Sequence, residues 1–177
     1  MSTPSTIHYL TAPCPLGSLV LATDKQGICA LLLADSPAAA LAELKQRFPL
    51  ATLHSNGKGL RTDLERVITW VKQPSHPLQL TQPLAPQGTA FQQQVWQALQ
   101  KTRPGQRLSY QQLAEQLGKP GASRAVAGAC AANPLALVIP CHRVVRSDGA
   151  LSGYRWGVAR KQALLQAEQS ASLAQAG

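Results

Sequence analysis

The sequence contains few acidic residues, few aromatic residues and no long apolar stretch. Charged residues make up 14% of the 177 residues and hydrophobic residues 45%, a balance that favours a folded core and excludes a disordered chain. No segment approaches the roughly 18 consecutive apolar residues of a membrane-spanning helix. The N-terminal sequence MSTPSTIHYL lacks the basic start and apolar core of a secretory signal. We therefore expect a cytoplasmic protein without membrane contact.

Closely spaced cysteine pairs are also absent. The four cysteines lie far apart and none forms a CxxC pair: Cys14, Cys29, Cys130 and Cys141. This spacing argues against a disulfide framework and against a zinc ribbon. Nor do the potential ligands of the first half show the spacing of a zinc site: Cys14, Cys29, His54 and His76. We expect no bound metal, and each cysteine has to be interpreted alone.

Acidic residues are scarcest in the second half of the chain. The protein has 17 Lys+Arg against 8 Asp+Glu, which gives a net charge of +9. Residues 1–88 contain 7 Lys+Arg and 5 Asp+Glu, whereas residues 89–177 contain 10 and 3. No carboxylate falls between Glu115 and Asp148, a stretch that holds Lys119, Arg124, Arg143 and Arg146. Because such a surface attracts phosphate, this half predicts an anionic partner; a basic face that only contacts solvent is the alternative.

The first part of the chain has the pattern of a small sheet with helices. Short apolar segments between turn residues predict antiparallel strands over 7–12, 18–23 and 28–33. Ser36 and Pro37 are typical of a helix start, and a second helix fits residues 60–71. Residues 73–88 contain four prolines and predict an irregular connection. We expect a supporting domain over 1–85 and a second domain over 86–177.

The second part is mainly helical. Thr89 suits the N-cap of one helix, and Ser109 suits that of a short helix that Gly118 ends. A further helix over 122–132 follows, which is the pattern of a helix-turn-helix. Its sequence, ASRAVAGACAA, carries Arg124 among small residues; it fits a smooth face in a DNA groove or, alternatively, a tightly packed core helix. The predicted fold class is α/β (α+β): a small antiparallel sheet with helices, then a mainly helical part.

The segment around Cys141 combines groups that can activate a thiol. Residues 135–139 are apolar and predict a buried extended segment that ends in PCHRV. A free thiol titrates near pH 8.5, so a nucleophilic cysteine needs help. Arg143 and Arg146 could supply positive charge, and His142 could accept the proton. The carboxylates that could orient His142 are Glu115, Asp148 and Glu168, the last at the end of a predicted helix over 158–167, from which it could face inward. A small buried hydrophobe is the alternative interpretation of Cys141.

Residues 88–168 also resemble a known family. NPLALVIPCHRVVRSDGALSGYRWGVARKQALLQAE is similar to the active-site region of the methylated-DNA:protein-cysteine methyltransferases (O6-alkylguanine-DNA alkyltransferases). The family's other blocks match FQQQVWQAL, RLSYQQLA and SRAVAGACAANP in order and spacing. Within the family, the chain most resembles the C-terminal alkyltransferase half of the bacterial adaptive-response regulator.

The resemblance implies catalytic roles for five residues. Cys141 would accept the alkyl group, His142 would take its proton through a water, and Glu168 would orient His142. Asn133 would support the turn that holds the site. Tyr110 would rotate a phosphate and help to protonate the departing guanine.

The resemblance also implies a surface for double-stranded DNA and a base pocket. Arg124 would fill the gap left by a flipped nucleotide, and Gln111 and Ser147 would touch the DNA backbone in the minor groove. The base pocket would be formed by Tyr154, the Val144 carbonyl and the Arg155 amide.

The implied function is repair of O6-methylguanine, and of O4-methylthymine, by direct irreversible transfer of the methyl group to Cys141. Because a thioether has no acyl carbon for water to attack, each molecule should act once, as a monomer and without a cofactor. The first alternative is a non-catalytic helix-turn-helix module that recognises damage or regulates transcription. The second is a cysteine hydrolase, which would turn over repeatedly.

Overall fold

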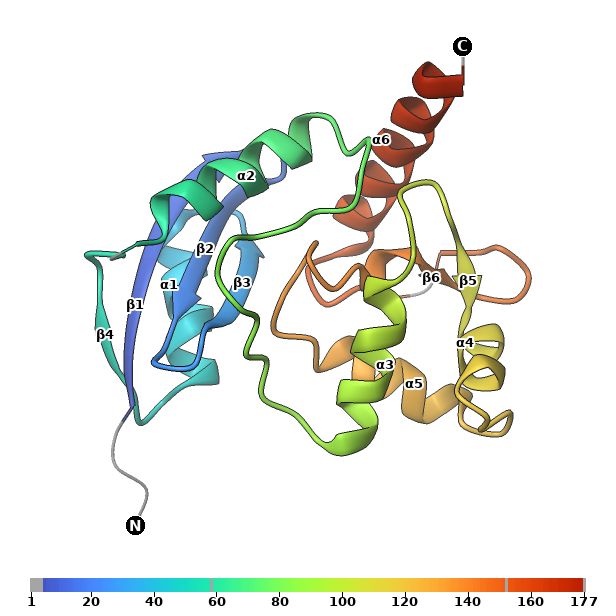
Figure 1. Cartoon of the computed structure of the whole chain (residues 1–177), viewed down its shortest axis with the longest axis horizontal. Coiled ribbons are helices and arrows are strands. Elements are labelled where there is room, and N and C mark those ends of the chain that lie inside the picture. Colours follow the sequence, from blue (N-terminus) through green and yellow to red (C-terminus); the bar gives the residue numbers. More distant parts are fainter. Residues whose placement is uncertain (1–4, 58, 152, 177) are drawn as a thin grey trace. The chain divides into compact units, whose positions relative to one another are not determined.

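The computed structural model describes residues 5–57, 59–151 and 153–176, which form two compact units (Figure 1). The first unit comprises the chain up to Lys72 together with Leu78–Gln87 and Pro134–Ala136. The second comprises Gln73–Pro77, Gly88–Asn133 and the chain from Leu137 onwards. A domain boundary between residues 85 and 86 stays a prediction that limited proteolysis can test.

The first unit is built on a four-stranded sheet in the order β3-β2-β1-β4. β1 (Thr6–Cys14), β2 (Gly17–Thr23) and β3 (Ile28–Ala34) pair antiparallel, as the sequence predicts. β4 (Thr52–His54) pairs parallel with β1, so the sheet is mixed rather than purely antiparallel. Three residues are too few to show an alternating pattern, which is why β4 was not predicted.

Two helices cover this sheet. α1 (Pro37–Arg47) packs on β1, β2 and β3, and α2 (Arg61–Lys72) packs on β1. The Ser36 hydroxyl accepts a hydrogen bond from the backbone N–H of Ala39, 3.1 Å away, so the predicted N-cap is confirmed. Every residue of β3 is buried. This unit therefore has a continuous apolar core.

The second unit is helical: α3 (Ala90–Gln100), α4 (Tyr110–Gln116), α5 (Ser123–Ala131) and α6 (Val158–Ala176). Thr89 and Ser109 each form the predicted cap, completed as a capping box by a glutamine three residues on. Gly118 has φ +73°, a conformation that favours glycine, and ends α4. α3 and α4 both pack on α5, and the Trp96 indole donates to the Ala129 carbonyl at 2.9 Å.

The segment before Cys141 corrects one prediction. Residues 135–139 are buried, but they form turns rather than an extended segment, with only Leu135 in a β-bridge to Leu31. Leu137 has φ +73°, which an apolar side chain rarely adopts. Asn133 holds the turn through its Nδ2, which donates to the Ile139 carbonyl at 2.9 Å. Tertiary hydrogen bonding therefore overrides the local preference of this apolar segment.

The rest of the second unit completes the frame of the site. A single 3-10 turn, η1 (Cys141–Arg143), leads into β6 (Val144–Val145), which pairs parallel with β5 (Leu108–Ser109). α6 packs on η1. The helix was predicted to end at residue 167, but it continues to Ala176 because the following segment is rich in alanine and contains neither glycine nor proline. Among the described residues, no helix is long and apolar enough to cross a membrane.

Candidate active site

A cavity of about 450 Å³ lies beside Cys141 in the second unit. It is formed by the start of α4, by α5, by η1 and by the segment before α6, and its lining is Tyr110, Ala127, Cys130, Ala131, Cys141, Gly153, Tyr154 and Arg155. A second cavity, of about 380 Å³, has four glutamines and Lys101 in its lining, and a third, of about 280 Å³, has Arg107. Of these three cavities, the one beside Cys141 is lined by thiols, which makes it the candidate for nucleophilic chemistry.

Cys141 is held with only 4% of its surface exposed. Asn133 Nδ2 donates to Cys141 Sγ at 3.2 Å, so Asn133 contacts the sulfur itself in addition to supporting the turn. Burial raises the pKa of the Cys141 thiol to about 11, although the Asn133 hydrogen bond and the charges of Lys161 and Arg155 oppose this. At neutral pH the resting thiol is protonated, so a nucleophilic role requires a base within the site.

A buried group of ionisable side chains begins at the residue after Cys141. His142 and Glu168 are both fully buried, and His142 Nε2 lies 2.7 Å from Glu168 Oε2. Burial lowers the pKa of His142 below its usual value, against the opposing effect of Glu168. Burial would raise the pKa of Glu168, but the hydrogen bonds and charges of His142 and Arg143 outweigh it and hold that pKa below its usual range. Glu168 is therefore ionised at neutral pH.

The charges acting on the thiol are not those that the sequence indicated. Arg143 points to Glu168 rather than to Cys141, with Nε 2.8 Å from Oε1. Arg146 is exposed, 4.0 Å from Asp148. The positive charges that favour the thiolate belong to Lys161 and Arg155. Arg155 was predicted only for its backbone amide, and Lys161 was not predicted at all, although it precedes Glu168 by two helical turns and so shares the inward face of α6.

The cavity wall contains a polar atom suited to a ligand. The Tyr154 hydroxyl is buried and has no hydrogen-bond partner among the described residues. Its ring packs edge-on against Trp156, with ring centres 5.3 Å apart. Arg155 stacks over the same indole at 5.3 Å, and its Nη1 donates to the Asn133 carbonyl at 3.1 Å. Because an unpaired buried hydroxyl is unfavourable, this wall fits a ligand with a hydrogen-bonding edge.

Three of the four predicted DNA-contacting residues are exposed on the second unit: Gln111, Arg124 and Ser147. The fourth, Tyr110, is half-buried and lines the cavity. Gln111 Nε2 donates to Glu115 at 3.3 Å. Arg124 precedes Ala127 and Ala131 of the cavity lining by one and two turns of α5, so it stands on the same helix face. Val144 lies in β6, and its residue is not part of the cavity lining.

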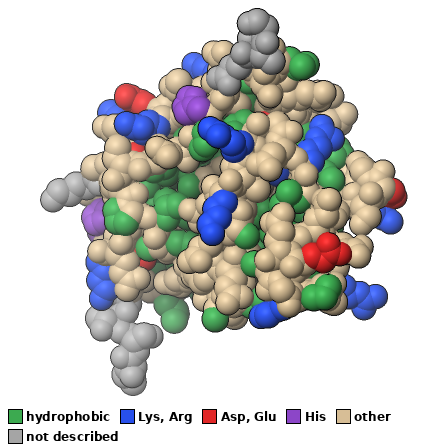
Figure 2. Space-filling view, turned by 45° about the vertical axis from the view of Figure 1, so that its right-hand side comes forward, with side chains coloured by type: hydrophobic (Ala, Val, Ile, Leu, Met, Phe, Trp, Pro, Cys, Tyr) green, Lys and Arg blue, Asp and Glu red, His purple; other side chains and the backbone are tan. Residues whose placement is uncertain are grey.

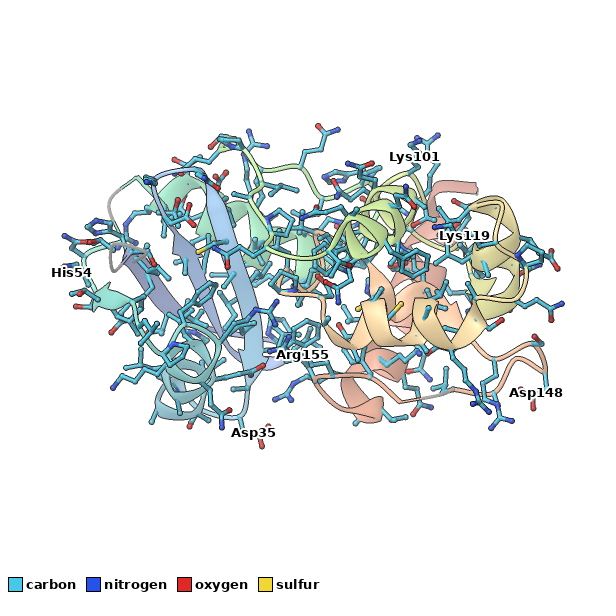
Figure 3. The ribbon with its side chains drawn as sticks, turned by 90° about the horizontal axis from the view of Figure 1, so that it is seen from below. Asp35, His54, Lys101, Lys119, Asp148 and Arg155 are labelled. Atoms are coloured by element: carbon cyan, nitrogen blue, oxygen red, sulfur yellow. The ribbon has the colours of Figure 1, made fainter. Side chains whose placement is uncertain are left out.

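Basic side chains are spread over the face of the molecule shown in Figure 2, where more Lys and Arg than Asp and Glu side chains are visible. Lys119, labelled in Figure 3, lies in the turn between α4 and α5, with its Nζ 4.9 Å from the ring centre of Phe91. Because residues 116–147 contain no Asp or Glu, an anionic partner of this segment would meet no carboxylate from it.

Two family models match the chain. The model described as "6-O-methylguanine DNA methyltransferase, ribonuclease-like domain" matches residues 7–101. The model described as "6-O-methylguanine DNA methyltransferase, DNA binding domain" matches residues 90–170. Together they cover both units.

Individual proteins are similar over half of the chain or more. The bifunctional transcriptional activator/DNA repair enzyme Ada of Escherichia coli is 52% identical over 92% of this chain, which spans 45% of that protein. The methylated-DNA–protein-cysteine methyltransferase of Shigella flexneri is 51% identical over 50% of this chain and 52% of its own length. The chain thus spans about half the length of these curated relatives. The crystal structure of Mycobacterium tuberculosis O6-methylguanine methyltransferase superposes with a TM-score of 0.71 at 34% identity, covering 93% of both chains.

Proposed function

The chain belongs to the 6-O-methylguanine DNA methyltransferase family, and we propose that it repairs O6-methylguanine in double-stranded DNA by moving the methyl group irreversibly to Cys141. O4-methylthymine, which carries the same oxygen-bound methyl group, is the second substrate. The observation that carries this proposal is a buried thiol on the wall of a cavity, backed by a buried histidine and carboxylate. A crystal structure of the Mycobacterium tuberculosis relative in complex with DNA, 33% identical, supports the choice of partner.

Cys141 has to lose its proton for the methyl transfer, whereas the resting thiol stays protonated. With a pKa of about 11, the thiol is ionised in about one molecule in ten thousand at pH 7. His142 takes the proton through a water, and Cys141 Sγ attacks the methyl carbon in line with the C–O6 bond. The S–C bond forms as the C–O bond breaks, and the electron pair leaves with the guanine, which Tyr110 helps to protonate. The thiol is the acceptor, so the reaction needs no cofactor and no metal.

Glu168 determines which nitrogen of His142 is basic. An ionised carboxylate can only accept hydrogen bonds, so the proton of neutral His142 resides on Nε2, 2.7 Å from Glu168. Nδ1 is then the nitrogen that can accept the thiol proton. As His142 becomes positively charged, the Glu168 carboxylate stabilises it. His142 is therefore neutral in the resting protein, and the ionised Glu168 beside it favours the transfer of a proton to it.

DNA has to deliver the base to the cavity. A base within a duplex cannot reach a thiol that is 4% exposed, so the nucleotide must be flipped at a cost of a few kcal/mol. Arg124 fills the vacated space from the minor groove, which α5 approaches closely through its small residues. Tyr110 rotates a phosphate, and Gln111 and Ser147 contact the backbone.

The flipped base is then recognised by its edge. The Tyr154 hydroxyl, buried and without a partner among the described residues, donates to the guanine. The Val144 carbonyl and the Arg155 amide lie near the base.

The proposal covers this chain alone. The transcriptional activity in the name of the Escherichia coli relative is not carried over, because the chain spans 45% of that protein. We propose that the protein acts in the cytoplasm and as a monomer.

Stoichiometry separates this proposal from its alternatives. Incubation with an O6-methylguanine duplex should consume one equivalent of lesion per protein and then stop. The variant Cys141→Ala should bind the duplex but consume none, whereas Cys29→Ala, which removes a fully buried thiol from β3, should consume one equivalent. Repeated turnover would indicate a hydrolase instead. Consumption by Cys141→Ala would exclude Cys141 as the acceptor, and binding by the wild type without consumption would favour the helix-turn-helix recognition module.

A further inference from the structure

The side chain of Arg143 joins Glu168 to the end of α3. Its Nε donates to both carboxylate oxygens, at 2.8 and 3.1 Å, and its Nη1 donates to the carbonyl and the hydroxyl of Thr102 at 3.0 and 2.8 Å. Arg143 is 2% exposed and Thr102 7%. A cation this deeply buried is committed to its protein partners and is not available to phosphate.

Thr102 is itself fixed. Its hydroxyl donates to the Leu99 carbonyl at 2.6 Å, so the single hydroxyl proton is used and a lone pair faces Arg143. The backbone N–H of Gly105, in the loop after α3, adds a contact of 3.3 Å to Glu168 Oε1. The carboxylate is thus bound on one side by Arg143 and this loop, and on the other by His142.

We infer that Arg143, anchored by Thr102, is a positioning residue for the transfer reaction: it holds the Glu168 carboxylate against His142 Nε2, so that Nδ1 stays the basic nitrogen. The inference rests on the proposed function. Without the guanidinium, Glu168 would be a buried carboxylate compensated only by uncharged groups, the His142 ring and the Gly105 N–H, and it would tend to take a proton. A protonated Glu168 could donate to Nε2 and would place the ring proton on Nδ1, where it blocks acceptance from Cys141.

The direction of the pH effect follows from the surrounding charges. The titratable groups that act on His142 or Glu168 are Arg143 beside them, Lys161 on α6 and Tyr154 before α6. The charge of Arg143 lowers the pKa of both His142 and Glu168, so loosening Arg143 lets this pair keep an additional proton up to a higher pH. With that proton on either residue, Nδ1 of His142 carries a hydrogen and cannot accept the thiol proton.

The test compares single-turnover methyl transfer from an O6-methylguanine duplex across pH for four proteins. Arg143→Lys keeps the charge but cannot reach Glu168 and Thr102 together, so we expect a rate at least about tenfold lower and an acid limb moved to higher pH. Thr102→Val should move the acid limb of the pH profile in the same direction by a smaller amount. Thr102→Ser, which keeps the hydroxyl, should retain the wild-type profile. Unchanged profiles in Arg143→Lys and Thr102→Val, or equal losses in the two Thr102 variants, would overturn the inference.

A second readout does not depend on activity. Nitrogen-15 NMR of the resting wild type should show His142 with its proton on Nε2, and Thr102→Val should titrate at higher pH than the wild type and Thr102→Ser. Identical tautomers and titrations in all three would contradict the positioning role, even if the wild type took up no methyl group and the proposed function failed. If Arg143→Lys does not fold, the Thr102 pair alone decides.

Discussion

Among the described residues, each unit of the molecule has one buried carboxylate, and these two carboxylates have different partners. Asp63 of α2 is fully buried and accepts hydrogen bonds from the Thr81 N–H and hydroxyl and from the Gln82 N–H, at 2.7, 2.9 and 3.1 Å. Glu168 is equally buried, but its main partners are His142 and Arg143. The donors to Asp63 are backbone N–H groups and a hydroxyl, and they fix residues 81 and 82 of the connecting segment to α2. The donors to Glu168 include a histidine that follows a cysteine in the sequence, and in the proposed reaction this carboxylate would control a proton. Burial alone therefore does not mark a site; the chemistry of the donors does.

The largest expected difference between Glu168 and Asp63 is in the rate of methyl transfer. Glu168→Gln should slow methyl transfer by about a hundredfold or more and raise the apparent pKa of the Cys141 thiol, because the charged form of His142 loses its counter-charge. Asp63→Asn should leave the rate of the folded protein unchanged and lower the free energy of unfolding by about 1–3 kcal/mol. Single-turnover kinetics and urea unfolding measure both. Similar rate losses in the two variants would remove the distinction.

A smaller effect on the rate distinguishes the buried His142–Glu168 pair from the exposed Arg124. Arg124→Ala should slow repair of the duplex by about tenfold, because no arginine side chain then fills the space that the flipped nucleotide leaves. Transfer from free O6-methylguanine should change little, since no nucleotide has to be flipped. Glu168→Gln should slow both substrates alike. The control is Arg61→Ala, which removes an exposed arginine from the first unit. Equal losses on duplex and free base would contradict the role of Arg124.

The smallest effect is on stability. The pKa of His142 is lower in the folded protein than in the unfolded chain, so below pH about 6.5 the unfolded chain binds a proton that the native state does not. Stability should fall as the pH drops from 7 to 5, and this loss should shrink by about 1 kcal/mol in His142→Gln. Urea unfolding between pH 7 and 5 measures the free energy of unfolding. If its dependence on pH were the same in His142→Gln as in the wild type, the lowered pKa of His142 would be contradicted.

The sequence predicted those features that depend on neighbouring residues. The caps at Ser36, Thr89 and Ser109 and the apolar spacing of the helices are local signals, and each of these helices is present. β4 and the β5–β6 pair have two or three residues each and form only through distant partners. The turn conformation of Leu137 likewise follows from contacts that no local pattern contains.

The candidate site shows the same limit. Cys141 and His142 are adjacent in the sequence, and Glu168 was one of three carboxylates available in the basic half. The structure brings His142 and Glu168 together, while their roles stay predictions. The sequence could not show that Arg143 turns to Glu168 and Thr102, because direction is decided by the 3-10 turn and by the packing of α6. Lys161 had a usable signal, its spacing from Glu168 on one helix.

The most direct test of the central claim is the intact mass of the protein after incubation with an O6-methylguanine duplex, followed by peptide mapping. The account predicts a gain of one methyl group on Cys141, saturating at one per molecule. No gain while the duplex remains bound, or a methyl group on another residue, would contradict it.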